Sequence, residues 1–423
     1  MKKLILASAL MAVSAGAFAS SGACSSVGTI AAVSYSWNGT AYTLCELPSS
    51  ITTDETLFNG NDTMTGQPVL WALPGIVTVG DGYEYGKTPA TANDAELTIE
   101  SGVNVIATAS NAALVISRGA TISAVGTAND PIVFSSSDEN YTGEGEWGGV
   151  ILSGFGVANE CNSGSDTCLM EGISSDYYFG GSLSTTMGSG ILKYVVITEG
   201  GSEINVNDPD DVANGGDEIN GLTLYAVNDT GTTIEYVHIN ENYDDGIEFF
   251  GGDVAVSDIW LTCNGDDSVD WDYGFHGSIE NVYIEQGDKN GAEDYAFELA
   301  GNPNNSAATP LASATVTGAW VQYNGSNAAT MTDAIFKLKE GTGNTNGTAN
   351  GVVGGTPLFD EIVITGYAGQ ECAEISSANI STDSFEAVSY DCAITAAADG
   401  KFVPTGSSSF TYNNSFWTAP ACL

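Results

Sequence analysis

The sequence predicts an all-β protein: a single-stranded, right-handed parallel β-helix, or solenoid, with caps at both ends and loop insertions. The main observation is a repeat. The tripeptide at 237–239 is followed 22 residues later by a similar one at 259–261, and 23 residues after that by one at 282–284. Each alternates apolar and other residues with a period of two, which indicates strands. A unit of about 20–25 residues with one apolar face must stack on its neighbours to bury that face.

The same 22-residue shift relates acidic residues, which is the second observation behind the predicted stacking. In a parallel β-helix, residues at equivalent positions of consecutive coils lie about 4.8 Å apart. Acidic side chains of consecutive coils should therefore be direct neighbours. Three pairs follow this rule: Asp244 with Asp266, Asp245 with Asp267, and Glu248 with Asp270.

Residues 1–19 have the pattern of a secretory signal peptide, with Lys2 and Lys3 before a short apolar stretch and small residues at the cleavage site. That stretch is too short to span a bilayer, and no later run of 18 apolar residues exists, so no membrane span is expected. We expect a secreted, extracellular or outer cell-surface protein. Lipid attachment at Cys24 is a less favoured alternative, because Ser21 stands where lipoproteins usually have an apolar residue.

The rest of the chain divides into an N-terminal cap with the first coils at 20–95, the β-helix at 96–400 and a C-terminal cap at 401–423. Aromatic residues between Phe402 and Trp417 are expected to cover the last coil. Polar insertions should project from the turns, where solenoids often place binding surfaces. They lie at 155–190, 201–218, 301–314 and 341–356.

The chain is strongly acidic. Loss of Lys2 and Lys3 with the leader reduces the 9 basic residues to 7, against 53 acidic ones, for a net charge of about −46. Such a field repels phosphate backbones, which excludes nucleic acid and acidic membranes as direct partners. Arg118 is the single arginine, and this argues against enzymes that hold uronate polymers through arginine. Two interpretations remain open: solubility in a salty environment, or a requirement for divalent cations.

All eight cysteines follow the leader, and an even number in an exported protein predicts disulfides. Their spacings match no zinc motif. The expected pairs are Cys24–Cys45, Cys161–Cys168, Cys372–Cys392 and, as the least secure, Cys263–Cys422.

Four short motifs lie within the first coils. Their order is Leu-Thr-Ile-Glu-x-Gly-Val at 97–103, Arg-Gly-Ala-x-Ile at 118–122, Gly-Thr-x-x-x-Pro-Ile-Val-Phe at 126–134 and Trp-Gly-Gly at 147–149. The segment 114–116 also repeats 97–99 at a spacing of 17. These motifs resemble the opening coils of secreted bacterial β-helix proteins of the broad pectate-lyase-like group, largely of uncharacterised type. The resemblance implies the fold and export, but no activity.

An aromatic row is one candidate site. His238, Trp260 and Tyr283 each lie between two inward-facing apolar residues, so they should face outward and stack, with Trp320 as a fourth member. Such a row can stack against sugar rings, which would make a polysaccharide or a cell-surface component the partner. The alternative is that a neighbouring insertion folds down and buries the row.

The acidic ladder is the second candidate site. Stacked carboxylates about 5 Å apart repel, whereas a calcium ion, with oxygen ligands at about 2.3–2.6 Å, would fit between two coils. The expected ligands are Asp244, Asp245, Glu248, Asp266, Asp267 and Asp270, with Asp288, Glu293 and Asp294 available to complete the shell. Against a calcium site, aspartates often cap their own turns.

A catalytic alternative rests on similarity to polygalacturonase-type glycoside hydrolases, which place paired carboxylates on adjacent coils. The resemblance would make Asp245, Asp266 and Asp267 the acid–base set, with His276 as their partner. The sequence departs from that pattern, because Asp244 replaces a threonine, His276 comes half a coil early and a later basic element is missing. The favoured function is therefore an exported binding or structural protein, stabilised by calcium.

Overall fold

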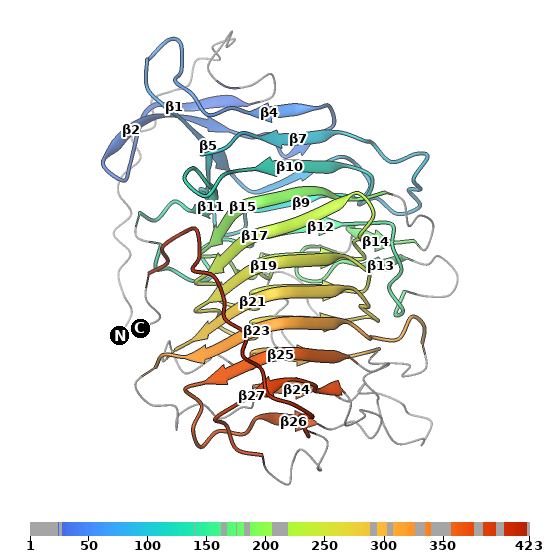
Figure 1. Cartoon of the computed structure of the whole chain (residues 1–423). Helices are drawn as coiled ribbons and strands as arrows, with labels where there is room; N and C mark the ends of the chain where they lie inside the picture. The colour runs from blue at the N-terminus through green and yellow to red at the C-terminus, as the bar shows by residue number, and fades with distance from the viewer. Residues whose placement is uncertain are drawn as a thin grey trace, which may run out of the picture.

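The protein is shown in Figure 1 as a computed structural model of the chain. The description that follows covers residues 24, 28–139, 141–161, 167–174, 176–181, 187–204, 219–287, 294–302, 308–325, 335–339, 357–375, 384–394 and 402–420. Residues 1–19, which form the predicted signal peptide, lie outside this part. No helix of the described part is long and apolar enough to cross a membrane.

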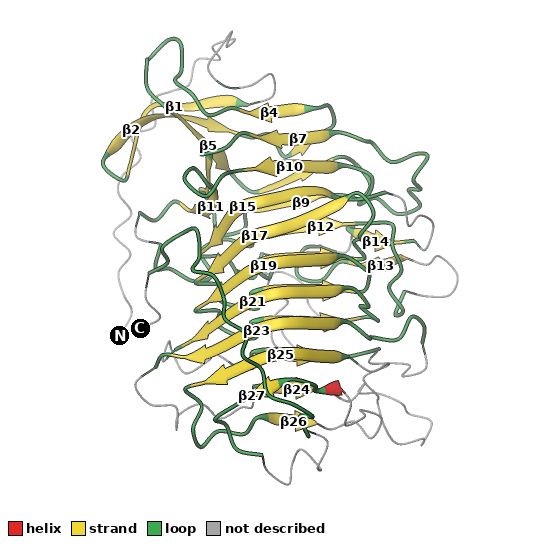
Figure 2. Ribbon diagram, in the orientation of Figure 1, coloured by secondary structure: helices red, strands yellow, loops and turns green. Residues whose placement is uncertain are grey.

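The chain forms a right-handed parallel β-helix, as predicted, and its strands stack along one axis in Figures 1 and 2. The longer of its two large sheets has 15 strands in the described part. Its main path is β1 (Thr29–Trp37), β2 (Thr40–Glu46), β5 (Val69–Leu73), β8 (Asn104–Ala107), β11 (Ile132–Ser136), β15 (Gly190–Thr198), β17 (Thr232–Asn240), β19 (Ala255–Thr262), β21 (Ser278–Gln286), β23 (Thr315–Tyr323), β25 (Leu358–Thr365) and β27 (Val388–Ser389). A branch of it contains β4 (Glu55–Leu57), β7 (Glu96–Ile99) and β10 (Thr121–Val125).

The shorter sheet has 10 strands in the described part and lies across the core from the long one. Its order is β3 (Ser50–Ile51), β6 (Ile76–Val79), β9 (Ala113–Ile116), β12 (Val150–Ser153), β16 (Leu222–Tyr225), β18 (Ile247–Phe250), β20 (Val269–Asp272), β22 (Phe297–Leu299), β24 (Phe336–Leu338) and β26 (Ala373–Ile375). A hairpin of β13 (Thr167–Leu169) and β14 (Tyr178–Gly180) comes from the 155–190 insertion.

Each long strand from β15 to β25 bends near its middle, which gives every coil a third face. The bend is a residue with positive φ, between 51° and 75° at the six equivalent positions. Two of the six are tyrosines, Tyr194 and Tyr236, whose rings stack with centroids 4.6 Å apart. Left-handed backbone is costly for residues other than glycine, so regular coil stacking must maintain it.

The predicted register is confirmed in the centre of the helix. Val237 pairs with Ile259, and Ile259 with Val282, while Glu248 pairs with Asp270. The 17-residue repeat is not a coil, however. Residues 97–99 belong to the long sheet and 114–116 to the short one, so this spacing is the step from one face to another within a coil. Both segments have the same apolar alternation because both faces pack on one core.

The first coil is closed by the β1–β2 hairpin, which pairs antiparallel before β2 joins β5 in parallel. A disulfide joins Cys24 to Cys45 with a Cα–Cα distance of 5.6 Å. Because its sulfur is in this bond, Cys24 has no thiol for lipid attachment, which disfavours the lipoprotein alternative.

Two further predicted disulfides are present. Cys161 is bonded to Cys168 and Cys372 to Cys392. Cys263 is also disulfide-bonded, while its predicted partner, Cys422, lies outside the described residues.

The C-terminal segment differs from the expected cap. Phe402 does cover the last coils, with its ring packed against Phe336 and Phe385. Residues 408–417, which we call the strap, instead run back along the outside of the long sheet, over β25, β23, β21 and β19, and are visible in red in Figure 1. The aromatic side chains of the strap pack against the outer face of this sheet. The sequence pattern did not predict this position.

Substitution in the core should test the stacking. Leu261→Ala removes a fully buried side chain from the centre of β19 and should lower the free energy of unfolding by about 2–5 kcal/mol. Urea unfolding followed by circular dichroism measures the change. Val125→Ala on β10, where the side chain is 42% exposed, is the control. Equal midpoints for both variants would contradict the assigned core.

Candidate functional site

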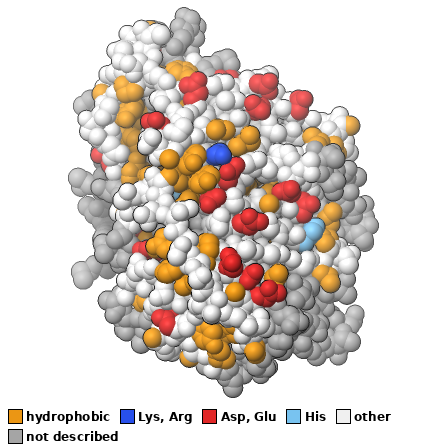
Figure 3. Space-filling model, in the orientation of Figure 1, with side chains coloured by type: hydrophobic (Ala, Val, Ile, Leu, Met, Phe, Trp, Pro, Cys, Tyr) orange, Lys and Arg blue, Asp and Glu red, His pale blue; other side chains and the backbone are white. Residues whose placement is uncertain are grey.

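The aromatic row faces outward from the long sheet, as predicted, but it is covered. His238, Trp260 and Tyr283 are only 2%, 5% and 8% exposed, and Trp320 is partly buried. Their register is confirmed, since the four residues pair directly across β17, β19, β21 and β23. The covering element is the strap and not an insertion, so the row is not an open surface for sugar rings. Figure 3 shows acidic side chains distributed over this face of the molecule.

Ring packing fastens the strap to the row. Tyr412 stacks on Tyr283 with ring centroids 4.1 Å apart. Phe416 meets Trp260 edge-on at 5.7 Å, and the indole N–H of Trp260 donates to the carbonyl oxygen of Asn413 at 3.1 Å. Buried aromatic pairs contribute about 0.5–1.5 kcal/mol each beyond their buried area. Side-chain packing therefore holds a segment that adds no strand to the sheet.

His238 is neutral, and its hydrogen bonds define the tautomer. The Thr262 hydroxyl donates to Asn240 Oδ1 at 2.7 Å, so it must accept from His238 Nε2–H, 2.9 Å away. His238 Nδ1 then accepts from the hydroxyl of Ser415 in the strap at 2.8 Å. Complete burial lowers the pKa of His238 to about 3. The ring thus joins the sheet to the strap as an uncharged group.

A small hollow remains between strap and sheet, with a volume of about 70 Å³ and walls that include Trp260, Tyr283 and Tyr412. Ligand pockets usually measure about 300–1,000 Å³. The hollow is therefore too small for an oligosaccharide.

The acidic ladder lies on the outer face of the short sheet, yet it is buried. Asp245, Glu248 and Asp270 are 6%, 8% and 8% exposed. The 155–190 insertion folds over the neighbouring part of this face, where the ring of Phe179 packs at a tilt against Tyr225 with centroids 4.6 Å apart. An insertion thus covers the sheet beside the ladder, and charges expected on an open surface lie in a poorly hydrated interior.

Burial raises the pKa of five carboxyl groups in and beside the ladder, and neighbouring carboxylates add to the effect. The pKa of Asp270 rises to about 6. The pKa values of Asp245, Glu248 and Asp267, and of the nearby Asp272 at the end of β20, are all raised well above the usual range. The largest influences on Asp245 and Glu248, after burial, are all acidic side chains. At neutral pH these groups need either protons or a cation.

Ligand oxygens converge in three groups along the ladder, and within each group they lie within 4.8 Å of one another. These groups together contain all six predicted calcium ligands. They are Asp245, Glu248 and Asp270 (group 1); Asp267, Asp270 and Glu298 (group 2); and Asp244, Asp245 and Asp266. The predicted supplementary ligands Asp288 and Glu293 lie outside the described residues, while Asp294 donates its backbone N–H to the carbonyl oxygen of Asp266.

Group 1 contains unused acceptors. Asp270 Oδ1 is buried and has no hydrogen-bond partner within the described part of the chain. The same is true of Asn220 Oδ1, whose side-chain amide donates from Nδ2 to Glu248 Oε2. A buried acceptor without a partner costs about 1–3 kcal/mol. Three converging carboxylates, one with an unused oxygen, and the nearby oxygen of Asn220 form a donor set suited to a metal ion.

The structure brings the proposed hydrolase residues together only in part. Asp245 and Asp267 are buried turn caps: Asp245 Oδ1 accepts from the backbone N–H of Asp267 at 2.9 Å, and Asp267 Oδ1 accepts from that of Tyr295 at 2.7 Å. Asp266 is exposed. His276 follows the C-terminal end of β20, whereas Asp267 precedes its N-terminal end, so the strand separates them. Asp245 and Asp266 therefore lie close together, whereas β20 separates His276 from Asp267.

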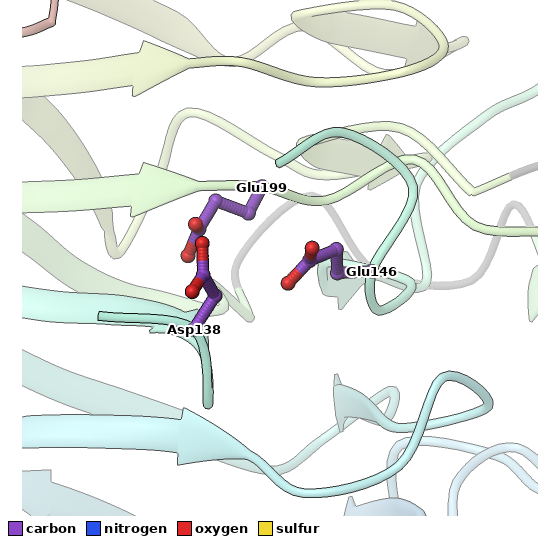
Figure 4. A group of neighbouring side chains, drawn as sticks. All are labelled: Asp138, Glu146 and Glu199. Carbon is purple, nitrogen blue, oxygen red and sulfur yellow. The ribbon is translucent and has the colours of Figure 1, made fainter. Parts of the chain in front are cut away.

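A separate acidic group lies at the end of β15. Figure 4 shows Asp138, Glu146 and Glu199 with their carboxylates turned toward one another. Burial, and then the charge of Glu146, raise the pKa of Glu199 to about 7. Backbone N–H groups of Ser136 and Gly143 donate to Glu199 at 3.1 and 3.5 Å. Glu199 thus anchors the loop after β11 to β15.

Sequence reasoning missed Glu298, Lys339 and Asn220. Glu298 repeats the apolar–acidic–apolar pattern of Glu248 and Asp270, and this signal could have revealed it. Its distance of 28 residues from Asp270 exceeds the 22-residue shift because an insertion intervenes. Lys339 and Asn220 stand outside the strands, where no period applies.

The lone arginine takes no part in any of these groups. Arg118 is fully buried and donates to the carbonyl oxygens of Gly82 at 2.7 Å, Glu84 at 3.0 Å and Gly180 at 2.8 Å. Burial lowers its pKa to about 10. It fastens loops and is unavailable to an anionic ligand.

Fold and site together define the class: a parallel β-helix with covered outer faces and a buried acidic ladder. The family model of the pectate-lyase-like β-helix domain matches residues 77–406. The chain belongs to this family. Comparison with curated proteins and with solved structures finds no significant match.

The neutral His238 predicts acid sensitivity. In the unfolded chain the ring takes a proton near pH 6.5, but in the folded protein only near pH 3. The contribution of His238 to stability should therefore fall as pH decreases below 6.5, by up to about 1.4 kcal/mol per pH unit relative to His238→Gln. The buried carboxyl groups with raised pKa values act in the opposite direction, and they do so equally in both proteins. Urea unfolding of the parent and of His238→Gln between pH 7 and pH 4.5 measures this slope, with His276→Gln as the control. An unchanged slope in His238→Gln would refute the assignment.

Loosening the strap should uncover the aromatic row. The double variant Tyr412→Ala/Phe416→Ala removes the rings packed on Tyr283 and Trp260. Acrylamide should then quench tryptophan fluorescence more strongly than in the parent. Val403→Ala, at a side chain that is 45% exposed, is the control and should leave quenching unchanged. Identical quenching in the double variant would show that the strap does not shield Trp260.

Proposed function

We propose that this protein is an exported β-helix scaffold whose buried acidic ladder binds a calcium ion at group 1. The observation that supports this most directly is the convergence of Asp245, Glu248 and Asp270. Their oxygens lie within 4.8 Å of one another, and each side chain is more than nine-tenths buried. Three charges so placed repel by roughly 3 kcal/mol per pair at an effective dielectric constant of about 20. A bound dication converts this repulsion into attraction.

Calcium fits group 1 better than magnesium does. Calcium takes six to eight oxygens at about 2.3–2.6 Å, so oxygens on opposite sides of the ion are about 5 Å apart. Magnesium needs about 2.0–2.1 Å in strict octahedral geometry and retains water. A set of three protein carboxylates with the neutral oxygen of Asn220 nearby suits the larger, more adaptable ion, because magnesium is usually held by one or two carboxylates and water.

Export is supported by the disulfides. The bonds of Cys24, Cys161 and Cys372 with their partners persist in oxidising compartments such as the extracellular space or the periplasm. Millimolar calcium is common outside cells, where sites of modest affinity suffice. A cell-surface location follows as part of the same proposal.

Carbohydrate binding by the aromatic row is not part of this proposal. The strap covers His238, Trp260 and Tyr283. A sugar ring would have to displace the rings already stacked there. A glycan partner would have to use a different surface.

Calcium should raise the thermal stability of the chelator-treated protein. For one site, calcium at 100 times its Kd adds about 2.7 kcal/mol to the free energy of unfolding. Differential scanning calorimetry with and without millimolar calcium, against equal magnesium at the same ionic strength, measures the effect. An unchanged Tm with calcium would end the calcium proposal.

Neutralising group 1 should produce opposite effects in the two conditions. Without calcium, Asp270→Asn removes repulsion and should be more stable than the parent by about 1–3 kcal/mol. With calcium, the variant should gain little and become the less stable of the two. Glu248→Gln should behave similarly, and Glu280→Gln, at an exposed position, should follow the parent. If calcium stabilised Asp270→Asn as much as it stabilises the parent, the ion would have to bind elsewhere.

A further inference from the structure

Group 2 of the ladder differs from group 1 because a cation of the protein already lies beside it. Asp267, Asp270 and Glu298 are buried, with oxygens within 4.8 Å of one another. Lys339 Nζ forms an ion pair with Glu298 Oε1. The charge of Lys339 also counteracts the rise in pKa of Asp267 and Asp270. The two groups share Asp270, so ions bound at both groups would lie close to each other.

Local structure explains how Lys339 reaches these carboxylates. It follows β24, and its backbone N–H donates to the carbonyl oxygen of Leu299 at 2.8 Å, which continues the pairing of β24 with β22. The Lys339 side chain is 46% exposed, whereas that of Glu298 is 9% exposed. Lys339 therefore approaches from the solvent side and extends its ammonium group toward a covered carboxylate, as lysine stems commonly do.

A second lysine in the same coil provides a comparison. Lys337 faces outward from β24 and pairs with Glu374 of the next coil at 2.5 Å. Although Lys337 lies beside Glu298 in the strand register, it forms its ion pair with Glu374. The two lysines thus serve different carboxylates: one inside the ladder and one beyond its end.

We propose that Lys339 is the resident cation of a second divalent-cation site, and that it limits the acidic ladder to one calcium ion. The proposal rests on calcium binding at group 1, because Asp270 belongs to both groups. The physical reason is charge. Dications that share a carboxylate are about 3.5–4 Å apart, and their repulsion scales with the product of the charges. An ammonium group beside a calcium ion halves that repulsion while it still neutralises part of group 2.

Removing the ammonium group should open the second site. Lys339→Met keeps the length of the side chain but not its charge. We expect the chelator-treated variant to bind one more calcium ion per chain than the parent, in equilibrium dialysis at an ionic strength of about 0.15 M, which screens loosely held surface ions. Lys337→Met is the matched control and should bind the same number as the parent. No additional ion in Lys339→Met would overturn the proposal.

Two further variants locate the additional ion. Lys339→Met/Glu298→Gln should return to the parent stoichiometry, and Lys339→Arg, which keeps the charge, should never gain the ion. A gain that persists in the double variant would also overturn the proposal. Far-UV circular dichroism establishes that each variant is folded before dialysis.

The outcomes separate this inference from the proposed function. In one outcome the parent binds no calcium, Lys339→Met binds one ion, and the added Glu298→Gln substitution abolishes that binding. This result would refute calcium binding at group 1 and support the role of Lys339. In the other outcome the parent binds calcium, Glu248→Gln abolishes this binding, and Lys339→Met binds no additional ion. This result would support calcium binding at group 1 and refute the role of Lys339.

Discussion

Parallel pairing of coils is the constraint on which the rest of this molecule depends. Each coil places a residue about 4.8 Å from its equivalent in the next, so like lies on like. Inside, this arrangement stacks Ile239 on Leu261 and Leu261 on Ile284 and forms one continuous core. Outside, the same geometry stacks Glu248 on Asp270. The register that stabilises the interior therefore creates repulsion between acidic side chains on the outer face of the short sheet.

Covering elements bury residues on the outer faces of both sheets. The insertion that follows β12 packs beside the acidic ladder, and the strap covers the aromatic row. Burial favours aromatic side chains, so Tyr283 gains a stacking partner in Tyr412. Burial is costly for carboxylates, as the raised pKa values of Glu248 and Asp267 indicate. One type of covering thus stabilises the fold directly, while the other requires compensation by protons or a cation.

Compensation by a protein cation is present at one part of the ladder only. Lys339 lies beside Glu298, whereas the strongest influences on Asp245 and Glu248 after burial are other acids. The asymmetry arises because a side chain reaches only the carboxylates near its own coil, and the next turns contain no comparable lysine in the described part. Group 1 can be neutralised by protons or by a diffusible cation. This contrast is the basis for locating calcium there.

The sequence by itself determined the repeating unit, the strand faces, the register of Val237, Ile259 and Val282, and the identity of stacked acids, because period and spacing are local properties of the chain. It also indicated three disulfides that the structure contains.

Only the tertiary structure decided what covers each face. The strap returns over residues some 130 to 180 positions earlier, and no local pattern encodes such a contact. The same is true of Lys339 and Asp270, which come together because insertions lengthen some coils and not others. Solvent exposure depends on the whole fold. Residues that the sequence pattern correctly placed on the outside of the coil are therefore buried under other segments of the chain.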